Sequence, residues 1–399
     1  MKVAIAAAGF TPTEANGLRR AMATFRRFGT IHGFRDKFID GMLGRGYERD
    51  FAERCFKQIE GFADYGFPES HAASFALIVY VSSWLKRHHP AAFAAALLNS
   101  QPMGFYAPAQ IVGDARDHGV EVRPVDVSFS DWDCTLEPSM CDGGAALRLG
   151  FRQVKGLAEE DAEAIVAARG DGFCDTDDVG ALARRAGLDR RALELLAGAD
   201  AFGSLGVGRR DALWAVRGLG EAPLPLFAAA EEAERGNEPA VTLPQAALGE
   251  QVADDYRAVR LSLKAHPLTV LRDRLAADGF RQTAAATAFP HDRRVKTAGL
   301  VVTRQRPGSA SGVIFITLED ESGHANLIVW PKVFERFRKT VLQATLIGIS
   351  GPVQREGAVV HILAERLWDL DPVLGDLTAD LAPSRADEAK FEVYSRDFH

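Results

Sequence analysis

The sequence predicts a multidomain protein that is mainly α-helical and ends in a C-terminal β-barrel. Three observations carry this prediction. The 399 residues exceed the usual size of one domain. Residues 1 to about 100 and 146–220 show helical periodicity, and 295–370 show alternating strand patterns separated by turn glycines. We expect divisions at residues 1–145, 146–220, 221–294, 295–370 and 371–399.

Composition narrows the class of protein. Hydrophobic residues make up 47% of the chain and charged residues 25%, which is ordinary for a globular domain. A net charge of -7 argues against a wholly basic nucleic-acid coat, although a local basic site stays open. Four cysteines without C-x-x-C spacing indicate neither a disulfide scaffold nor a zinc site, and favour the reducing cytoplasm. No apolar run reaches transmembrane length, so we expect no membrane contact.

The first clear helix begins at a capping box. Thr11 suits the N-cap position, and Glu14 follows three residues later. Arg19 and Arg20 lie beside the apolar side of this helix, and Arg26 follows Arg19 by two helical turns. Such a charge run is either a solvated face or an anion-binding surface for phosphates, and the pattern alone leaves both open.

The stretch FADYGFPESHAASFALIVYVSSWLKRHHP predicts a sharp corner followed by a long helix. Pro68 ends one element, and the next helix is expected to run to His88-His89, before Pro90. Within it, His71 either hydrogen-bonds a ligand or plays a structural part. The apolar side, which we expect to pack against other parts of the protein, consists of Phe75, Ile78, Val79 and Leu85.

Two carboxylates flank Trp132 and raise the question of a metal site. Asp131 and Asp133 stand two residues apart, a spacing that places both side chains on one face of a strand. The same spacing is common in loops. We therefore expect no metal ligand here and assign no catalytic residue within the chain.

Residues 146–220 read as short helices separated by small-residue turns. Lys155-Gly156-Leu157 forms one such turn, and Gly198 and the Gly206–Gly208 stretch mark others. In tandem helix-hairpin-helix units, glycines of this kind let backbone N–H groups approach a DNA phosphate. A compact helical bundle without DNA contacts would produce a similar pattern. Lys155, Gly156 and Gly198 are the DNA-binding candidates.

Residues 221–294 are expected to be a linker followed by a helical connector. The stretch from Gly218 to Gln245 is rich in Pro, Glu and Ala and includes APLPLF. Its apolar residues would suit a groove on a partner protein, or would lie back on their own domain. These residues are Leu224, Leu226 and Phe227.

Residues 295–370 carry three strand patterns, a helix at 332–343 and two further strand patterns. This order, with turns at Gly308, Gly323 and Gly357, is typical of an OB-fold. OB-folds bind single strands through aromatic and basic side chains. The candidates are Arg304, Arg306 and Trp330, whereas Phe315 could equally be core. The tail at 371–399 has no convincing periodicity.

Several long stretches resemble bacterial C-family DNA polymerases. They are LRRAM, YGFPESHAASFALIVYVSSWLKRHHPAAFAAALLNSQPMGFY, VRPVDVSFSDWD and YRAVRLSLKAHPL. The resemblance extends to the polymerase III alpha subunit and more closely to its error-prone, damage-inducible branch, which LLNSQPMGFY is most similar to. It covers nearly the whole chain, although relatives have a different basic run near Arg26 and the alpha subunits tend to have Asn-Lys in place of Pro68-Glu69.

The resemblance implies a role for each region. Residues 1–145 resemble the polymerase fingers, which close over an incoming deoxynucleoside triphosphate, so Arg19, Arg20, Arg26 and His71 become triphosphate-binding candidates. Residues 146–220 resemble the part that grips duplex DNA, and 295–370 the part near single-stranded template. The implied function is the carboxy-terminal portion of an error-prone polymerase for damage-induced mutagenesis and translesion synthesis.

The family's magnesium-binding aspartates belong to a palm domain that precedes the fingers. We match no residue of this chain to that motif, so Mg²⁺ is expected for the intact family enzyme and not for this chain, which we expect to be inactive alone. Leu224, Leu226 and Phe227 fall where a replicative relative carries its sliding-clamp peptide, so the clamp or a Y-family-like adaptor is a candidate partner. The alternative is a non-enzymatic DNA-binding or adaptor protein built from hairpin and OB modules.

Overall fold

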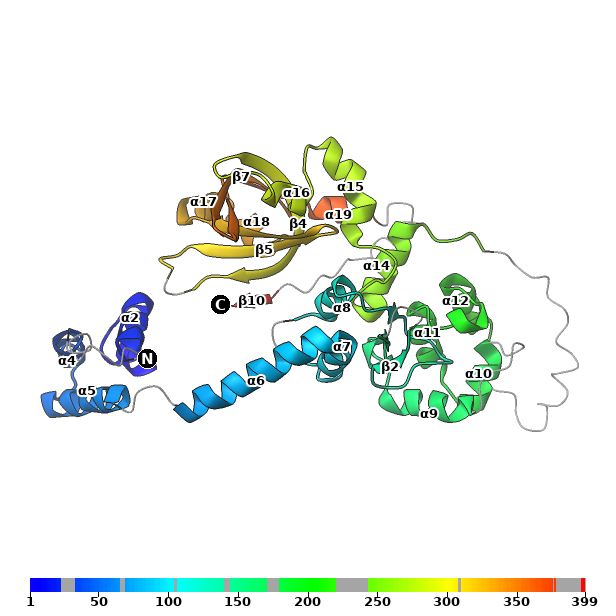
Figure 1. Cartoon of the computed structure of the whole chain (residues 1–399), viewed down its shortest axis with the longest axis horizontal. Coiled ribbons are helices and arrows are strands. Elements are labelled where there is room, and N and C mark those ends of the chain that lie inside the picture. The colour runs from blue at the N-terminus through cyan, green and yellow to red at the C-terminus, as the bar shows by residue number, and fades with distance from the viewer. Residues whose placement is uncertain are drawn as a thin grey trace, which may run out of the picture.

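A computed structural model describes residues 1–22, 33–64, 69–103, 106–139, 144–170, 179–219, 243–307, 310–375, 377 and 396–398. Figure 1 shows the N-terminal helices at one end of the molecule, helices α9 to α12 at the other, and a β-sheet between them. Within the described ranges, no helix is both long and apolar enough to cross a membrane.

Helices occupy most of the chain before residue 290. The N-terminal part contains α1 (Lys2–Ala6), α2 (Pro12–Met22), α4 (Arg35–Leu43), α5 (Arg49–Asp64), α6 (Glu69–His88), α7 (Pro90–Asn99) and α8 (Pro108–Asp117). The middle part contains η1 (Phe151–Gln153), α9 (Glu159–Arg169), α10 (Val179–Ala186), α11 (Arg190–Gly198), η2 (Gly203–Leu205) and α12 (Arg209–Gly218). The connector contains α14 (Leu248–Val259), α15 (Pro267–Ala277) and α16 (Thr283–Thr287). Proline begins α7, α8 and α15, where a missing N–H costs no hydrogen bond.

Two sheets accompany these helices. A small one has the order β1-β3-β2 and consists of β1 (Val122–Arg123), β2 (Thr135–Pro138) and β3 (Ala145–Arg148). The larger one contains β4 (Arg294–Gln305), β5 (Ile314–Asp320), β6 (Gly323–Val329), β7 (Leu346–Glu356), β8 (Val359–Leu363), β9 (Arg366–Asp369) and β10 (Arg396–Phe398). Helices α17 (Pro331–Arg336), α18 (Arg338–Gln343) and α19 (Asp371–Gly375) complete this part.

The larger sheet confirms the predicted strand order. Strands β4, β5, β6, β8 and β7 pair in succession, and β7 pairs back onto β4, as in an OB-fold. Two details differ from the prediction. The expected helix at 332–343 is divided at Phe337, whose φ of -117° ends α17 before α18 begins. The last predicted strand is divided into β8, which pairs with residues 353–356 of β7, and β9, which pairs with residues 347–350 of β7.

Four groups of buried side chains organise the fold. One joins α1, α2, α4 and α5, and a second joins α7 and α8 to the small sheet and to α9 to α12. A third fills the interior of the larger sheet. The fourth packs α15 and α19 onto the outside of β4 and β7, through residues such as Leu271, Leu300 and Leu346. Helix α15 of the connector therefore shares a core with the OB-fold, whereas Val259 at the end of α14 belongs to the core of the hairpin module.

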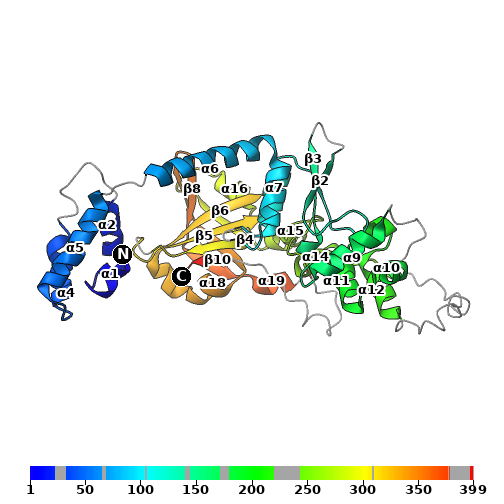
Figure 2. The same ribbon diagram turned by 90° about the horizontal axis from the view of Figure 1, so that it is seen from below.

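Helix α6 is long, and many of its apolar side chains are exposed. It runs from the N-terminal helices to α7, as Figure 2 shows, and it ends at His88 as predicted. Its expected packing surface is not covered by the described part of the chain, because Phe75 is 52% exposed, Ile78 56% and Val79 61%. An exposed apolar surface of this kind is unusual for a globular protein.

Candidate nucleic-acid interface

The first candidate region is helix α2. The predicted capping box is present, because the Thr11 N–H donates to Glu14 Oε2 at 2.9 Å and the Glu14 N–H donates to Thr11 Oγ1 at 3.3 Å. A hydrogen bond from Lys37 also lowers the pKa of Glu14 to about 2. Arg19 and Arg20 are both exposed, and Arg19 Nε donates to Asn16 Oδ1 at 3.0 Å. Both guanidinium groups are therefore accessible to an anion.

Several predicted site residues lie outside what the structure describes. Arg26 falls in 23–32, and the linker residues Leu224, Leu226 and Phe227 fall in 220–242. His71 lies in the first turn of α6, but its side chain is not described. Their roles stay predictions.

The first hairpin lies between η1 and α9. Gly156 has a φ of +88°, a left-handed conformation that favours glycine, and both Lys155 and Gly156 are exposed. The Lys155 N–H donates to the Ala258 carbonyl at 2.8 Å, which fastens the hairpin to α14. The N-cap residue of α9, Ala158, provides no side-chain acceptor for the first N–H groups, and Glu159, Glu160 and Asp161 in the first turn add negative charge.

The second hairpin joins α11 to α12. Gly198, which the sequence marks as a turn residue, is the last residue of α11 and does not have a positive φ. The turn after α11 instead uses Asp200, with a φ of 58°, whereas the predicted turn at Gly206–Gly208 is confirmed by Gly206, with a φ of +69°. The turn was therefore predicted two residues too early, at Gly198. The role of Gly198 as a DNA contact stays a prediction.

A further turn, which the sequence analysis missed, connects α10 to α11. Gly187 has a φ of +63°, and Asp189 caps α11 by accepting a hydrogen bond from the Ala192 N–H at 2.7 Å. The available signal was Gly-Leu-Asp immediately after a helical pattern, since glycine ends helices and aspartate begins them. Three turns thus lie in the described part of this module, at 154–158, 187–189 and 199–208.

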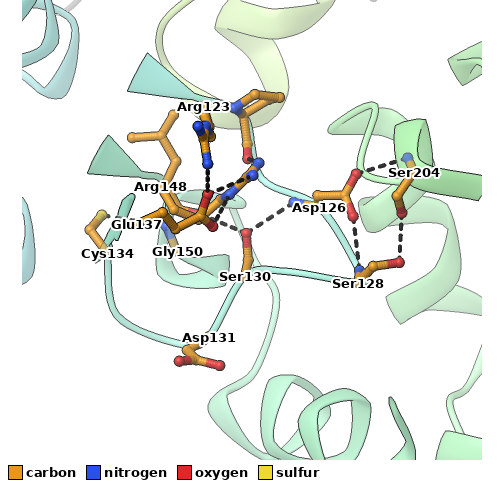
Figure 3. Close-up of polar contacts among 12 residues, drawn as sticks. Arg123, Asp126, Ser128, Ser130, Asp131, Cys134, Glu137, Arg148, Gly150 and Ser204 are labelled. Atoms are coloured by element: carbon orange, nitrogen blue, oxygen red, sulfur yellow. Dashed lines mark hydrogen bonds and ion pairs between the residues drawn. The ribbon is translucent and has the colours of Figure 1, made fainter. Parts of the chain in front are cut away.

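Asp126 fixes the second hairpin to the small sheet, as Figure 3 shows. Its carboxylate accepts hydrogen bonds from the Ser128 N–H at 2.8 Å and from the Ser204 N–H at 2.9 Å. The hydroxyls of Ser128 and Ser204 are 2.6 Å apart. The Asp126 N–H donates to Ser130 Oγ, which donates to the Leu149 carbonyl. This buried network explains why the stretch VRPVDVSFSDWD matters for the position of the hairpin.

A second polar cluster holds the small sheet together. Glu137 accepts from Arg123 Nη1 at 2.5 Å and from Arg148 Nε at 2.7 Å, and the Arg148 hydrogen bond is the main cause that lowers the pKa of Glu137 (Figure 3). Nearby, burial raises the pKa of the Cys134 thiol, whose Sγ accepts from the Gly150 N–H at 3.4 Å. Arg123 and Arg148 therefore both form ion pairs within the small sheet.

The arginines at the start of α12 point into the protein. Arg209 is buried and forms an ion pair with Asp255 of α14, which also accepts from Lys264 Nζ at 3.0 Å. Arg210 Nη2 lies 2.5 Å from Glu250 Oε2, a contact that raises the pKa of Arg210. These cations link the hairpins to the connector and are partly neutralised there.

The two aspartates around Trp132 also serve as ion-pair partners. Asp131 Oδ1 lies 2.5 Å from Arg169 Nη2, and Asp133 Oδ1 lies 2.7 Å from Arg152 Nη1. Among the residues that the structure describes, no group of three or more His, Cys, Asp and Glu side chains is arranged to hold a metal ion.

The OB-fold separates its three candidates. Arg304 is buried and donates through Nη2 to the Ala344 carbonyl, so a phosphate would not reach its guanidinium in this conformation. Arg306 is exposed, and its guanidinium lies 5.4 Å from the centre of the Phe334 ring. Trp330 is 51% exposed at the N-cap of α17. Only Arg306 and Trp330 are accessible to a strand of nucleic acid.

Three family models match the chain in order. Residues 1–46 match the bacterial DNA polymerase III alpha subunit finger domain, 119–212 the helix-hairpin-helix motif, and 295–370 the OB-fold nucleic acid binding domain. Together with the hairpins and the sheet, these matches define a chain built from a polymerase finger segment, a helix-hairpin-helix module and an OB-fold.

Similar proteins of known name identify the family more precisely. An error-prone DNA polymerase of Ruegeria pomeroyi is 57% identical over 94% of this chain and 34% of its own length. One of Brucella abortus is 55% identical over 100% of this chain and 38% of its own length. The chain belongs to the bacterial error-prone DNA polymerase family and spans little more than a third of the length of these relatives. The solved asparaginyl-tRNA synthetase of Pyrococcus horikoshii is 18% identical over 22% of each chain, with a TM-score of 0.19.

Proposed function

We propose that this chain is the carboxy-terminal, DNA-holding portion of an error-prone DNA polymerase that acts in damage-induced mutagenesis and lesion bypass in the cytoplasm. The observation that carries the proposal is the order of finger, hairpin and OB modules in one chain, with 57% identity over 94% of its length to an error-prone polymerase. The parent reaction transfers a nucleotidyl group from a deoxynucleoside triphosphate to a primer end.

Duplex DNA is the proposed ligand of the first hairpin. The exposed Lys155 supplies a cation, and the uncapped start of α9 supplies backbone donors at the same place. Gly156 allows the backbone to approach a phosphate without a side chain in the way. The carboxylates of Glu159 and Glu160 limit the affinity of this contact, which favours a grip that releases DNA readily.

The triphosphate is the proposed ligand of α2. Arg19 and Arg20 are adjacent and exposed within the part that matches the polymerase finger domain. Arginine suits this role because its planar guanidinium donates two parallel hydrogen bonds to phosphate oxygens. Arg26 and His71 would extend the site. Magnesium ions, when bound to the intact family enzyme, neutralise phosphate charge, and we place their ligands in the palm domain that precedes the fingers in this family.

The linker segment Leu224, Leu226 and Phe227 is the proposed partner peptide. Its apolar residues stand between the hairpin module and the connector, where a clamp or an adaptor related to Y-family polymerases would reach them. Replacing Phe227 with alanine should abolish binding to the isolated clamp if the contact is direct, and should leave it unchanged if an adaptor mediates it.

Duplex binding tests the proposal most simply. Fluorescence anisotropy with a labelled duplex should show an affinity that falls with salt, by about 0.9 in log K per log unit of salt for each phosphate contact. The Lys155→Gln variant should lower this slope by about one contact. Arg274→Gln removes the same charge from the exposed surface of α15 and should not change it. Absent or salt-independent duplex binding would contradict the proposed function.

A further inference from the structure

One end of the OB-fold carries a dense group of basic side chains. Helices α17 and α18 contribute four of them, and Arg306, just after the end of β4, contributes the fifth. The two helices contain a single acidic residue, Glu335. Five positive charges and one negative charge give a local charge of +4. We call this the helical basic surface, and its members, all exposed, are Arg306, Lys332, Arg336, Arg338 and Lys339.

Aromatic rings hold part of this surface in place. The guanidinium groups of Arg306 and Arg338 lie 5.4 and 5.3 Å from the centre of the same ring, that of Phe334. This ring is only 3% exposed, so its anchor is rigid. Arg336 lies 5.1 Å from the ring centre of Phe337. Cation–π contacts of this kind restrict the arginines while leaving their N–H groups free to donate to an anion.

The helical basic surface is not neutralised by the described part of the chain. None of its five cations forms an ion pair with a described carboxylate, unlike Arg294, which lies against Glu365, or Arg272, which lies against Glu321. Like charges concentrated in this way repel one another, and a bound polyanion relieves the repulsion. The surface therefore favours a ligand with several regularly spaced negative charges.

Trp330 supplies a stacking platform beside the cations. It is 51% exposed and immediately precedes Pro331 at the start of α17. A Cβ placed on Gly312 would lie 3.6 Å from Pro331 Cγ and 3.8 Å from Arg306 Nη2, which shows that this corner of the helix and the arginine are close together. An exposed indole next to guanidinium groups suits an unpaired base better than it suits an acidic peptide.

The outer face of strands β4, β5 and β6 offers a contrasting surface. Register pairs Gln305 with Phe315 and Phe315 with Ile328, and pairs Glu319 with His324. In one half of this face the outward side chains contain no Lys or Arg, and they are Thr303, Gln305, Phe315, Thr317, Glu319, His324, Asn326 and Ile328. The other half of β4 adds Arg294, which pairs with Glu365, and Lys296, which lies over the Phe280 and Trp368 rings. A phosphate backbone lying across the first half would meet the Glu319 carboxylate and no arginine or lysine.

We propose that single-stranded nucleic acid binds along the helical basic surface, with its phosphates on the five cations and a base stacked on Trp330. The outer face of β4 to β6 is not the path of the phosphate backbone. This assignment rests on the proposed function and adds to it the side of the OB-fold that holds the strand.

The test compares two double variants of the whole chain. Arg336→Gln with Arg338→Gln removes two charges from the helical basic surface, and Arg257→Gln with Arg274→Gln removes two from exposed positions on α14 and α15. Anisotropy is measured with a labelled oligothymidylate of about 16 nucleotides, the upper end of OB site sizes. The first pair should lower the salt slope by about 1.4, since each phosphate contact on a single strand contributes about 0.7, and the control pair should leave it unchanged.

A second comparison tests the stacking contact. Trp330→Ala should weaken oligothymidylate binding roughly tenfold, whereas Trp214→Ala, at an indole that is 59% exposed on α12, should not. Equal single-strand affinity in the variants and their controls would overturn the assignment. The duplex probe separates a failure of this assignment from a failure of the proposed function. If the unaltered chain binds duplex DNA and Lys155→Gln weakens that binding, the proposed function stands even when the strand assignment fails. If the unaltered chain binds neither the duplex nor the oligothymidylate, both proposals are rejected.

Discussion

The hairpin module and the helical basic surface are both rich in arginine, but they use it differently. In the hairpin module, Arg148, Arg209 and Arg210 each form an ion pair with a carboxylate of the same chain. On the helical basic surface, Arg336 and Arg338 lie over aromatic rings and have no described carboxylate partner. The number of cations in a segment is therefore a poor guide to its affinity for nucleic acid, and their pairing is a better one.

The difference has a physical cause. Arg148 and Arg209 are buried and Arg210 is partly buried, and a buried guanidinium is tolerated only beside a carboxylate because its loss of hydration is large. Acidic residues of α14, such as Glu250 and Asp255, meet this requirement. The cations of α17 and α18 are exposed and remain hydrated, so they need no partner within the chain.

The largest expected effect follows from breaking the buried pair. Asp255→Asn removes the carboxylate that accepts from both Arg209 and Lys264 and leaves Arg209 buried beside an amide. Removing one partner of a buried pair typically costs about 3–5 kcal/mol. Urea unfolding of the whole chain, followed by tryptophan fluorescence, should show a loss of stability in this range.

A neighbouring residue serves as the control for that measurement. Asp254 lies 3.7 Å from Arg209 and 2.5 Å from Arg257, but its side chain is more exposed than that of Asp255. Asp254→Asn should cost at most about 1 kcal/mol. If both variants lost the same small amount of stability, the arginines of the hairpin module would not be structural and the contrast between the two regions would disappear.

A smaller effect is expected from releasing the second hairpin. Asp126→Ala removes the acceptor of the Ser128 and Ser204 N–H groups, and both of these hydrogen bonds are partly buried. Because the cost of a lost partner is about 1–3 kcal/mol for a buried donor, each loss here is expected at the low end, about 1 kcal/mol. Hydrogen exchange should accelerate at Ser204 and its neighbours in η2, and exchange in β5 and β6 should be unchanged. If η2 exchanged at the same rate in the Asp126→Ala variant as in the unaltered protein, this role of Asp126 would be excluded.

The smallest effect concerns pH and the outer face of the sheet. A hydrogen bond with Glu319 raises the pKa of His324 above 6.5, whereas burial lowers the pKa of His266 below it. Because the folded pKa of His324 is raised, its contribution to stability is complete below pH 6.5 and is lost as the pH rises through the folded value. NMR titration should order the two histidines in this way, and Glu319→Gln should lower the pKa of His324. An unshifted His324 would show that Glu319 is free to meet other ligands.

Elements with strong local signals could be predicted from the sequence. The capping box at Thr11 and Glu14, the end of α6 before Pro90 and the strand order of the OB-fold depend on local residue types and periodicity. The turn at Gly198 was misplaced because two small residues follow it, and the backbone reverses at Asp200 instead.

The candidate site was harder to predict because exposure and pairing depend on distant residues. Arg304 lies in β4 and Arg306 lies just after its end, two positions later in the sequence. Arg304 is buried against Ala344, whereas Arg306 is accessible. Nothing near Arg209 in the sequence indicates Asp255, which is 46 residues away. The basic residues of 332–339 were visible in the sequence, but the lack of a carboxylate beside them became apparent only in three dimensions.

Hydrogen exchange of the whole chain with and without an oligothymidylate tests the central claim most directly. The account predicts slower exchange in residues 331–343 and no change in α11 or α12, since Arg209 and Arg210 of α12 are already paired. Slower exchange confined to α11, α12 and the turn between them, with 331–343 unaffected, would contradict it.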